Sequence, residues 1–222
     1  MLTYNHILND KLIQKIYNNI DKNEPAPWAT HGLGHINNVL LYARKICDLL
    51  EIDNHTFSLC AIACVLHDTG ALLGKLNHAQ RSFEFAKNYL CFFGLKENDK
   101  HEIEQAILHH SQTRFHAPLI EKVLVLADKL DFSKERLLPF GKTVEGVRQM
   151  QHILNVNLKV ENEEFCVDVE TDHNFNLTEW ENYYFTAKIY DAISNLAISK
   201  DLTPTINYNK EPSQFFCNQQ TF

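Results

Sequence analysis

The sequence predicts a mainly α-helical protein that ends with a β-hairpin and one long helix. Apolar residues recur at helical spacing through most of the first 140 residues. After about residue 150 the period changes, and apolar residues alternate over two short runs that a polar turn separates. We therefore expect a helical core over residues 1–150, a hairpin-plus-helix appendage over residues 151–200 and a polar tail over residues 201–222.

Six helices are expected in the first part of the chain, because apolar residues return every three to four positions there. They span residues 6–20, 36–50, 56–68, 78–93, 99–110 and 118–131. The third of these segments is apolar nearly all round, which is typical of a central, buried helix. Gly94 is expected to end the fourth helix, Asp99 to cap the fifth, and Pro118 to lie in the first turn of the sixth.

A hairpin and a last helix are expected after these. The alternating apolar residues are Val156, Leu158 and Val160, then, beyond the turn ENEE, Phe165, Val167 and Val169. Thr178 and Glu181 have the spacing of a capping box, which predicts a helix from residue 178 to about residue 199. From Pro204 onward the chain is polar and is expected to be loosely held.

Composition excludes several classes of protein. The chain has 222 residues, of which 45% are hydrophobic and 22% are charged, as in an ordinary globular protein. No window approaches the roughly 18 uninterrupted apolar residues of a membrane span, and the N-terminal segment does not have the order of a secretory signal. The formal net charge of −7 argues against general nucleic-acid binding, but not against a small phosphorylated substrate. Six cysteines without a CxxC pair favour a reduced, cytoplasmic location.

The stretch CVLHDTGALLGKLNH, residues 64–78, carries an apolar run directly into a histidine and an aspartate. Neither side chain is readily buried unless it has a partner. Other histidines and aspartates also fall at helix ends or on apolar faces, and the full set is His35, His67, Asp68, His78, His109, His110 and Asp128. Imidazole and carboxylate together are typical ligands of manganese, iron, zinc or nickel. The sequence therefore predicts a metal site.

The order of these residues is specific. His35, then the adjacent pair His67 and Asp68 in CVLHDTGA, then Asp128 in VLVLADKLD, resembles the HD-domain superfamily of metal-dependent phosphohydrolases. The resemblance covers roughly residues 28–137 and implies an HD-type helical bundle. His78 and His110 match the subset of this superfamily that holds two metals.

Within that subset, AILHHSQ followed by IEKVLVLADKLD is similar to bacterial HD-type dinucleoside tetraphosphate hydrolases. The ligand position falls on His110 and not on His109, and Ser111 stands where that family has threonine. The acidic residue three positions after the aspartate is Asp131, but the nearby arginine is displaced to Arg136. The segment after residue 150 has no matching counterpart.

The resemblance implies how the metals would be held and used. Asp68 would bridge two ions, with His35, His67 and Asp128 on one and His78 and His110 on the other. The expected ions are manganese or iron, with magnesium, cobalt, nickel or zinc as alternatives. A metal-activated hydroxide would then cleave a phosphoester or phosphoanhydride bond of a nucleotide or a related small phosphate compound.

Further residues are candidates for catalysis and for substrate binding. Lys75, Arg81 and Lys129 could bind phosphate, although such residues are more often solvated helix charges. His31, expected to act with Asp68 in catalysis, and His109, expected to bind substrate, could donate a proton, support a ligand or lie at the surface.

Two other functions remain open at the level of sequence. Some two-metal HD proteins resemble di-iron oxygenases that cleave C–C or C–P bonds, and a non-catalytic metal- or ligand-binding module would carry the same ligands. Metal identity and oxygen dependence would separate these. The hairpin is expected to form a lid or wall over the site or a contact in a homodimer, and its acidic residues argue against direct phosphate binding by it.

Overall fold

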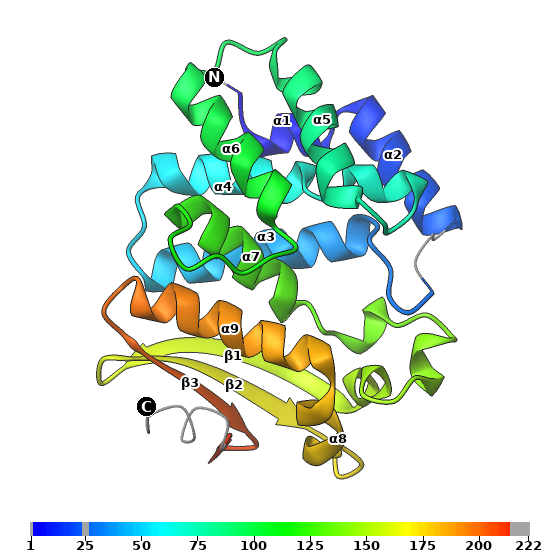
Figure 1. Cartoon of the computed structure of the whole chain (residues 1–222), viewed down its shortest axis with the longest axis vertical. Coiled ribbons are helices and arrows are strands. Elements are labelled where there is room, and N and C mark those ends of the chain that lie inside the picture. The colour runs from blue at the N-terminus through cyan, green and yellow to red at the C-terminus, as the bar shows by residue number, and fades with distance from the viewer. Residues whose placement is uncertain (1, 24–26, 214–222) are drawn as a thin grey trace.

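Helices make up the first 130 residues of the protein, which a computed structural model describes over residues 2–23 and 27–213 (Figure 1). They are α1 (Tyr4–Leu8), α2 (Lys11–Asn23), α3 (Leu33–Leu49), α4 (Asn54–Leu66), α5 (His78–Leu90), α6 (Glu97–His109) and α7 (Leu119–Leu130). A short 3₁₀ helix, η1 (Thr69–Leu73), follows α4. The prediction of a mainly helical fold is confirmed.

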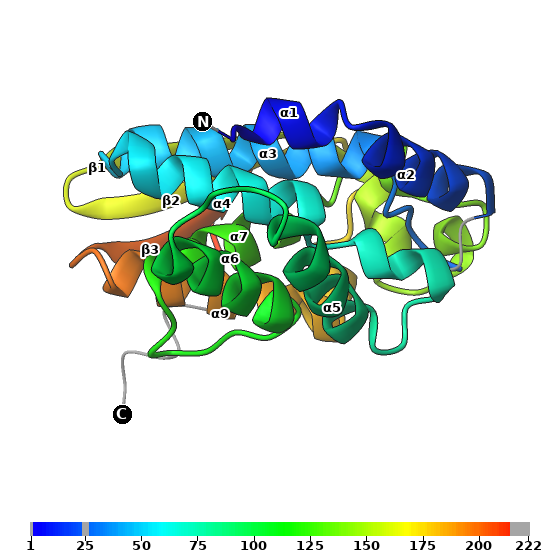
Figure 2. The same cartoon turned by 90° about the horizontal axis from the view of Figure 1, so that it is seen from above.

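Helix α4 forms the centre of this bundle, as its uniformly apolar sequence predicts. It packs against α1, α3, α6 and α7, and Figure 2 shows α4 and α7 between α3 and α6. Asp53 caps its first turn by accepting hydrogen bonds from the backbone N–H groups of His55 and Thr56. The run Asn54–Leu73 is long and apolar enough to cross a membrane, but 78% of its window is buried inside the protein, so it is a core helix.

The C-terminal part adds a small sheet and two helices. The strands are β1 (Ile153–Glu161), β2 (Glu164–Thr171), β3 (Thr203–Tyr208) and β4 (Glu211–Pro212), in that order across the sheet. The helices α8 (Leu177–Asn182) and α9 (Tyr184–Ile198) connect β2 to β3, and α9 lies between the sheet and α7 (Figure 1). One cluster of buried apolar side chains includes both parts, so the division predicted at residue 150 falls within a shared core.

The predicted hairpin is confirmed, and a two-residue turn joins its strands. β1 and β2 pair antiparallel from Ile153 opposite Thr171 to Glu161 opposite Glu164. The two turn residues, Asn162 and Glu163, both have positive φ, which matches the right-handed twist of the flanking strands.

Several predicted helix boundaries were wrong. The helix expected over residues 6–20 is interrupted between α1 and α2, where Asp10 accepts a hydrogen bond from the Leu12 N–H. The fourth helix ends at Leu90 and not at Gly94. The fifth begins at Glu97, so Asp99 lies in its first turn and is not its cap.

The last helix is also divided, because Tyr183 has an extended backbone that separates α8 from α9. Asn176, not Thr178, caps α8, and its side chain accepts a hydrogen bond from the Glu179 N–H.

The expectation of a loosely held segment after Pro204 was wrong for residues 203–208. They form β3, which pairs parallel with β2. The side chains of this strand alternate in burial, since Ile206 and Tyr208 are buried while Thr203 is exposed, as is typical of a strand with one face on the core. The rest of the predicted tail, residues 214–222, lies outside the described residues, as do residues 24–26 of the connection between α2 and α3.

Candidate metal centre

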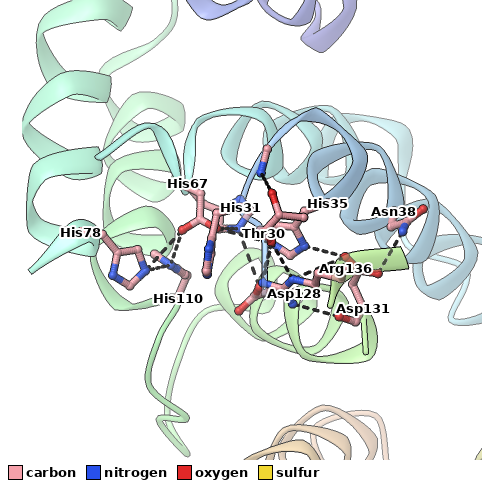
Figure 3. A network of polar contacts seen from close by, with 12 residues as sticks. Thr30, His31, His35, Asn38, His67, His78, His110, Asp128, Asp131 and Arg136 are labelled. Carbon is pink, nitrogen blue, oxygen red and sulfur yellow. Dashed lines mark hydrogen bonds and ion pairs between the residues drawn. The ribbon is translucent and has the colours of Figure 1, made fainter. Parts of the chain in front are cut away.

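The ends of five α-helices and one 3₁₀ turn bring the predicted ligands together (Figure 3). His35 lies in the first turn of α3, and His78 is the first residue of α5. The remaining four are at or near C-terminal ends: His67 after α4, Asp68 at the start of η1, His110 after α6 and Asp128 in the last turn of α7. Residues more than 90 positions apart in sequence therefore share one buried site.

The Asp68 carboxylate lies between two pairs of histidines. Its Oδ2 atom is 3.4 Å from Nε2 of His35 and 3.3 Å from Nε2 of His67. Its Oδ1 atom is 3.3 Å from Nε2 of His78 and 3.5 Å from Nε2 of His110. One side chain thus offers one oxygen to each half of the cluster.

Asp128 belongs to one half only. Its Oδ1 atom is 3.2 Å from Nε2 of His35 and 3.8 Å from Nε2 of His67. In the other half, Nε2 of His78 and Nε2 of His110 are 3.0 Å apart. The first half therefore has two carboxylates, and the second shares the single carboxylate of Asp68.

The four imidazoles are oriented by hydrogen bonds on their outer sides. Each uses Nδ1 for a partner outside the cluster, which leaves Nε2 facing inward. The partners are the Asp131 carboxylate for His35 at 2.7 Å and the carbonyl oxygens of Cys64 for His67 at 2.8 Å, Lys75 for His78 at 2.8 Å and Ile107 for His110 at 2.7 Å. A ring that donates Nδ1–H to a carbonyl presents the lone pair of Nε2 to the cluster.

The two halves differ in electrostatics. Burial opposes a charge on His67, but the carboxylates of Asp68 and Asp128 outweigh it and raise the pKa of His67 to about 10. Burial dominates at His78, whose pKa falls to about 3, and it also lowers the pKa of His110. Burial likewise opposes ionisation of Asp68, but the neighbouring positive groups outweigh it and hold the pKa well below the usual value. The first half favours positive charge more strongly than the second.

These side chains fit divalent metal ions. Four buried side-chain atoms have no hydrogen-bond partner among the described residues, and two of them, His67 Nε2 and Asp68 Oδ1, lie in this cluster. Buried polar atoms are rarely left unpaired in proteins. Donor atoms of His35, His67 and Asp128, and separately those of His67, Asp68 and His110, lie within 4.8 Å of one another. Imidazole nitrogen with carboxylate oxygen suits manganese, iron, zinc or nickel.

Three of the other predicted residues, His31, Lys75 and Lys129, lie at the edge of the cluster. Lys75 Nζ is 2.7 Å from Nε2 of His31, which is only 4% exposed. Both line a cavity of about 370 Å³ that Asp128 also lines. Lys129 is buried, and its Nζ donates to the His110 carbonyl oxygen at 3.2 Å and lies 4.0 Å from Asp128 Oδ2.

The side chains of Arg81 and His109 are hydrogen-bonded to groups outside the cluster. The Arg81 guanidinium donates to the carbonyl oxygens of Gly70 at 2.9 Å, Leu76 at 2.7 Å and Gly74, so it holds the loop before α5. His109 Nδ1 is hydrogen-bonded to the Gln105 carbonyl oxygen and lies 3.7 Å from Glu121. His109 also lines a second pocket, together with His78 and Lys75.

Three residues outside the predicted set support the cluster from one side (Figure 3). Asp131 accepts from His35 and, at 2.9 Å, from the Asn38 side chain. Arg136 donates to the carbonyl oxygens of Thr30 and Asp131, both at 2.9 Å, and its Nη2 lies 3.4 Å from Nε2 of His35. The resemblance already indicates Asp131 as the acidic residue three positions after Asp128, and the structure places it at the C-cap of α7.

Comparison with known proteins agrees with this geometry. Residues 32–133, which include all six predicted ligands, match the HD domain family. A crystal structure of a predicted HD superfamily hydrolase from an uncultured Thermotogales bacterium is similar, with a TM-score of 0.46 and 23% sequence identity over 63% of this chain and 80% of that one. No curated protein matches the chain.

Proposed function

We propose that the chain uses two divalent ions to hydrolyse a small phosphate compound, because residues 32–133 match the HD domain family and the ligand set resembles that of metal-dependent phosphohydrolases. The bond cleaved would be a phosphoester or phosphoanhydride bond, and the substrate a nucleotide or a related compound. Manganese and iron are the proposed ions, and the cytoplasm is the proposed location, since the cysteines among the described residues are free thiols.

The position of Asp68 carries this proposal. His35, His67 and Asp128 would hold one ion, His78 and His110 would hold the other, and Asp68 would give one carboxylate oxygen to each. When bound, such ions lower the pKa of a water molecule to near neutrality and offset charge on the phosphoryl oxygens.

The chain's own residues would do the rest at the edge of the cavity. The Lys75 ammonium, next to His31, places positive charge where a phosphate would enter. The pair also holds a proton between two nitrogen atoms 2.7 Å apart, and we propose that His31 passes a proton to the leaving oxygen. Asp131 and the backbone carbonyls keep the imidazoles fixed, so little reorganisation is needed when substrate binds.

Metal content and hydrolysis of the Asp68→Asn variant test the proposal. We expect the wild-type protein to hold two equivalents of manganese or iron by elemental analysis and to release phosphate from a nucleotide panel. Asp68→Asn should lose metal and reduce kcat/KM by more than about 100-fold, because the asparagine amide has a single, uncharged oxygen and cannot serve both ions. The matched control is Asp48→Asn, since Asp48 is exposed and its carboxylate pairs with Arg44 on the surface of α3. Retention of two ions and full activity in Asp68→Asn would refute the proposal.

The same preparation addresses the oxygenase alternative. If iron is the bound metal, oxygen consumption should be measured with each candidate substrate. Phosphate release that continues without oxygen supports hydrolysis, whereas oxygen uptake coupled to C–C or C–P cleavage supports an oxygenase.

A further inference from the structure

The cavity beside the cluster is lined by two chemically different groups of residues. The polar and charged group, here called the polar end, consists of His31, Lys75, Asp128, Asp131 and Arg136. The second group consists of four aromatic residues, here called the aromatic wall: Trp28, Tyr183, Tyr184 and Phe185. Val147 and Met150 add apolar surface next to the wall. The volume of about 370 Å³ is within the range of small-molecule sites.

The Tyr183 corner of the wall is held by a close backbone approach. Gly146 has φ of +78°, a conformation that favours glycine, and a Cβ atom there would lie 2.5 Å from Cβ of Tyr183. The Gly146 N–H donates to Glu179 at 2.8 Å, and Arg148 donates to both carboxylate oxygens of Glu179 at 2.9 and 2.8 Å. This clamp fixes the turn before β1 against the junction of α8 and α9.

Trp28 is fixed from the opposite side. The Leu138 N–H donates to the Trp28 carbonyl oxygen at 2.9 Å, and Ala29 and Leu137 form a β-bridge. Gly141 approaches so closely that a Cβ atom there would lie 2.2 Å from the same carbonyl oxygen. Both sides of the wall are therefore built into the fold, which reduces the entropy lost on binding.

A substrate made only of phosphate and sugar would leave this wall in contact with water. Planar aromatic groups stack on aromatic side chains and gain from removal of apolar surface from water. The polar end lies at the proposed metal centre, and the aromatic wall continues from it within one cavity. A molecule that fits both ends has a phosphate joined to a planar ring.

We propose that the aromatic wall binds the nucleobase of a phosphorylated substrate whose phosphate lies at the polar end. The inference rests on the proposed function and deepens it, because it names what selects the substrate. Tyr183, Tyr184 and Phe185 lie outside residues 32–133, so the selectivity comes from the segment that the family match does not include.

The test measures binding of nucleosides, which carry no phosphate, to the metal-free protein by calorimetry. Adenosine, guanosine, cytidine and uridine are compared with ribose, and each nucleoside 5′-monophosphate is compared with ribose 5-phosphate in hydrolysis by the metal-loaded protein. We expect at least one nucleoside to bind while ribose does not. Tyr184→Ala should weaken that binding by about tenfold or more, because one stacking surface is lost.

The variants are chosen to preserve the fold. Tyr184 is 57% exposed, so its truncation leaves the core intact, and Trp28→Leu changes the opposite side of the wall. The matched control is Phe92→Ala, which removes an aromatic ring that is 85% exposed and lines no part of this cavity.

The outcomes separate the two proposals. Nucleoside binding that is lost in Tyr184→Ala and kept in Phe92→Ala supports the nucleobase site even if no nucleotide is hydrolysed, a result that would refute only the proposed function. Equal kcat/KM for ribose 5-phosphate and the nucleotides would overturn the nucleobase site while leaving hydrolysis intact. Nucleoside binding unchanged in both Tyr184→Ala and Trp28→Leu would also overturn it.

Discussion

The metal centre and the aromatic wall border the same cavity, but they differ in residue type and in the part of the chain that supplies them. The centre consists of buried imidazoles and carboxylates from α3 to α7, all within the HD match. The wall consists of aromatic rings from the connection before α3 and from the α8–α9 corner, all outside that match. The difference suggests that reaction and selectivity reside in separate parts of the chain, so each should respond to its own substitutions.

Apart from Asp68→Asn, the largest effect should come from a substitution of His110, and it should be confined to the centre. His110→Gln removes one of the two imidazoles that face Asp68 Oδ1, so we expect one ion to be lost and kcat/KM to fall by about 100-fold. Nucleoside binding to the metal-free variant should not change. Elemental analysis and calorimetry check these two expectations.

The adjacent residue provides a control for metal content. His109 is hydrogen-bonded to the Gln105 carbonyl oxygen and lies beside Glu121, so His109→Gln should keep both ions. Loss of metal from His109→Gln, or two ions in His110→Gln, would contradict the arrangement of the two halves.

A smaller effect is expected at Asp131, which contacts the centre only through His35. Asp131→Asn weakens the acceptor for His35 Nδ1–H, so metal affinity should fall by about 10- to 100-fold without loss of the site. Competition with a chelator of known affinity measures this change. Asn38→Ala, which removes a second hydrogen bond to Asp131 but leaves His35 paired, should have a weaker effect, and the reverse order would contradict the role of Asp131.

The smallest effect concerns the clamp behind the wall. The hydrogen bonds from Arg148 outweigh burial and, with the Gly146 N–H, lower the pKa of Glu179 from 4.5 to about 2. A lowered pKa in the folded state stabilises the protein above pH 4.5, and this contribution is lost as the pH falls toward 2. Glu179→Gln should therefore be slightly less stable than wild type at neutral pH.

Urea unfolding at about pH 7 and about pH 3 tests this dependence. The difference in the free energy of unfolding between wild type and Glu179→Gln should shrink at the lower pH. It should be small at both, because Arg148 is half exposed and its charge is screened by water. Equal differences at the two pH values would show that the clamp acts through packing alone, and metal content should be unaffected throughout.

The sequence predicts the centre better than the wall for a physical reason. Burying a histidine or an aspartate without a partner is unfavourable. Such residues within apolar runs at helix ends therefore indicate a site in the sequence itself, before any contact is known. Aromatic residues carry no such signal, because Tyr183 and Phe185 suit an ordinary amphipathic helix. Tyr183 instead has an extended backbone at the junction of α8 and α9, next to Gly146, and both residues line the cavity.

Arg81 shows the opposite error. Its position three residues after His78 suggested a phosphate contact, but the guanidinium donates to the carbonyls of the loop from Gly70 to Leu76. Loop carbonyls lack helical partners, and a nearby arginine satisfies them at little cost. Likewise β3 was missed because parallel pairing with β2 depends on a crossover through α8 and α9, which local patterns do not reveal.

That crossover affects the order in which the metal centre and the aromatic wall can form during synthesis. Every proposed metal ligand has been synthesised once the chain reaches residue 128. The junction of α8 and α9, which carries three residues of the aromatic wall, lies in the connection between β2 and β3. That connection is closed only when residues 203–208 pair with β2. Contacts between such distant segments form slowly, because a long loop must close first. A nascent chain therefore contains every proposed metal ligand before it can form the aromatic wall that is proposed to select the substrate.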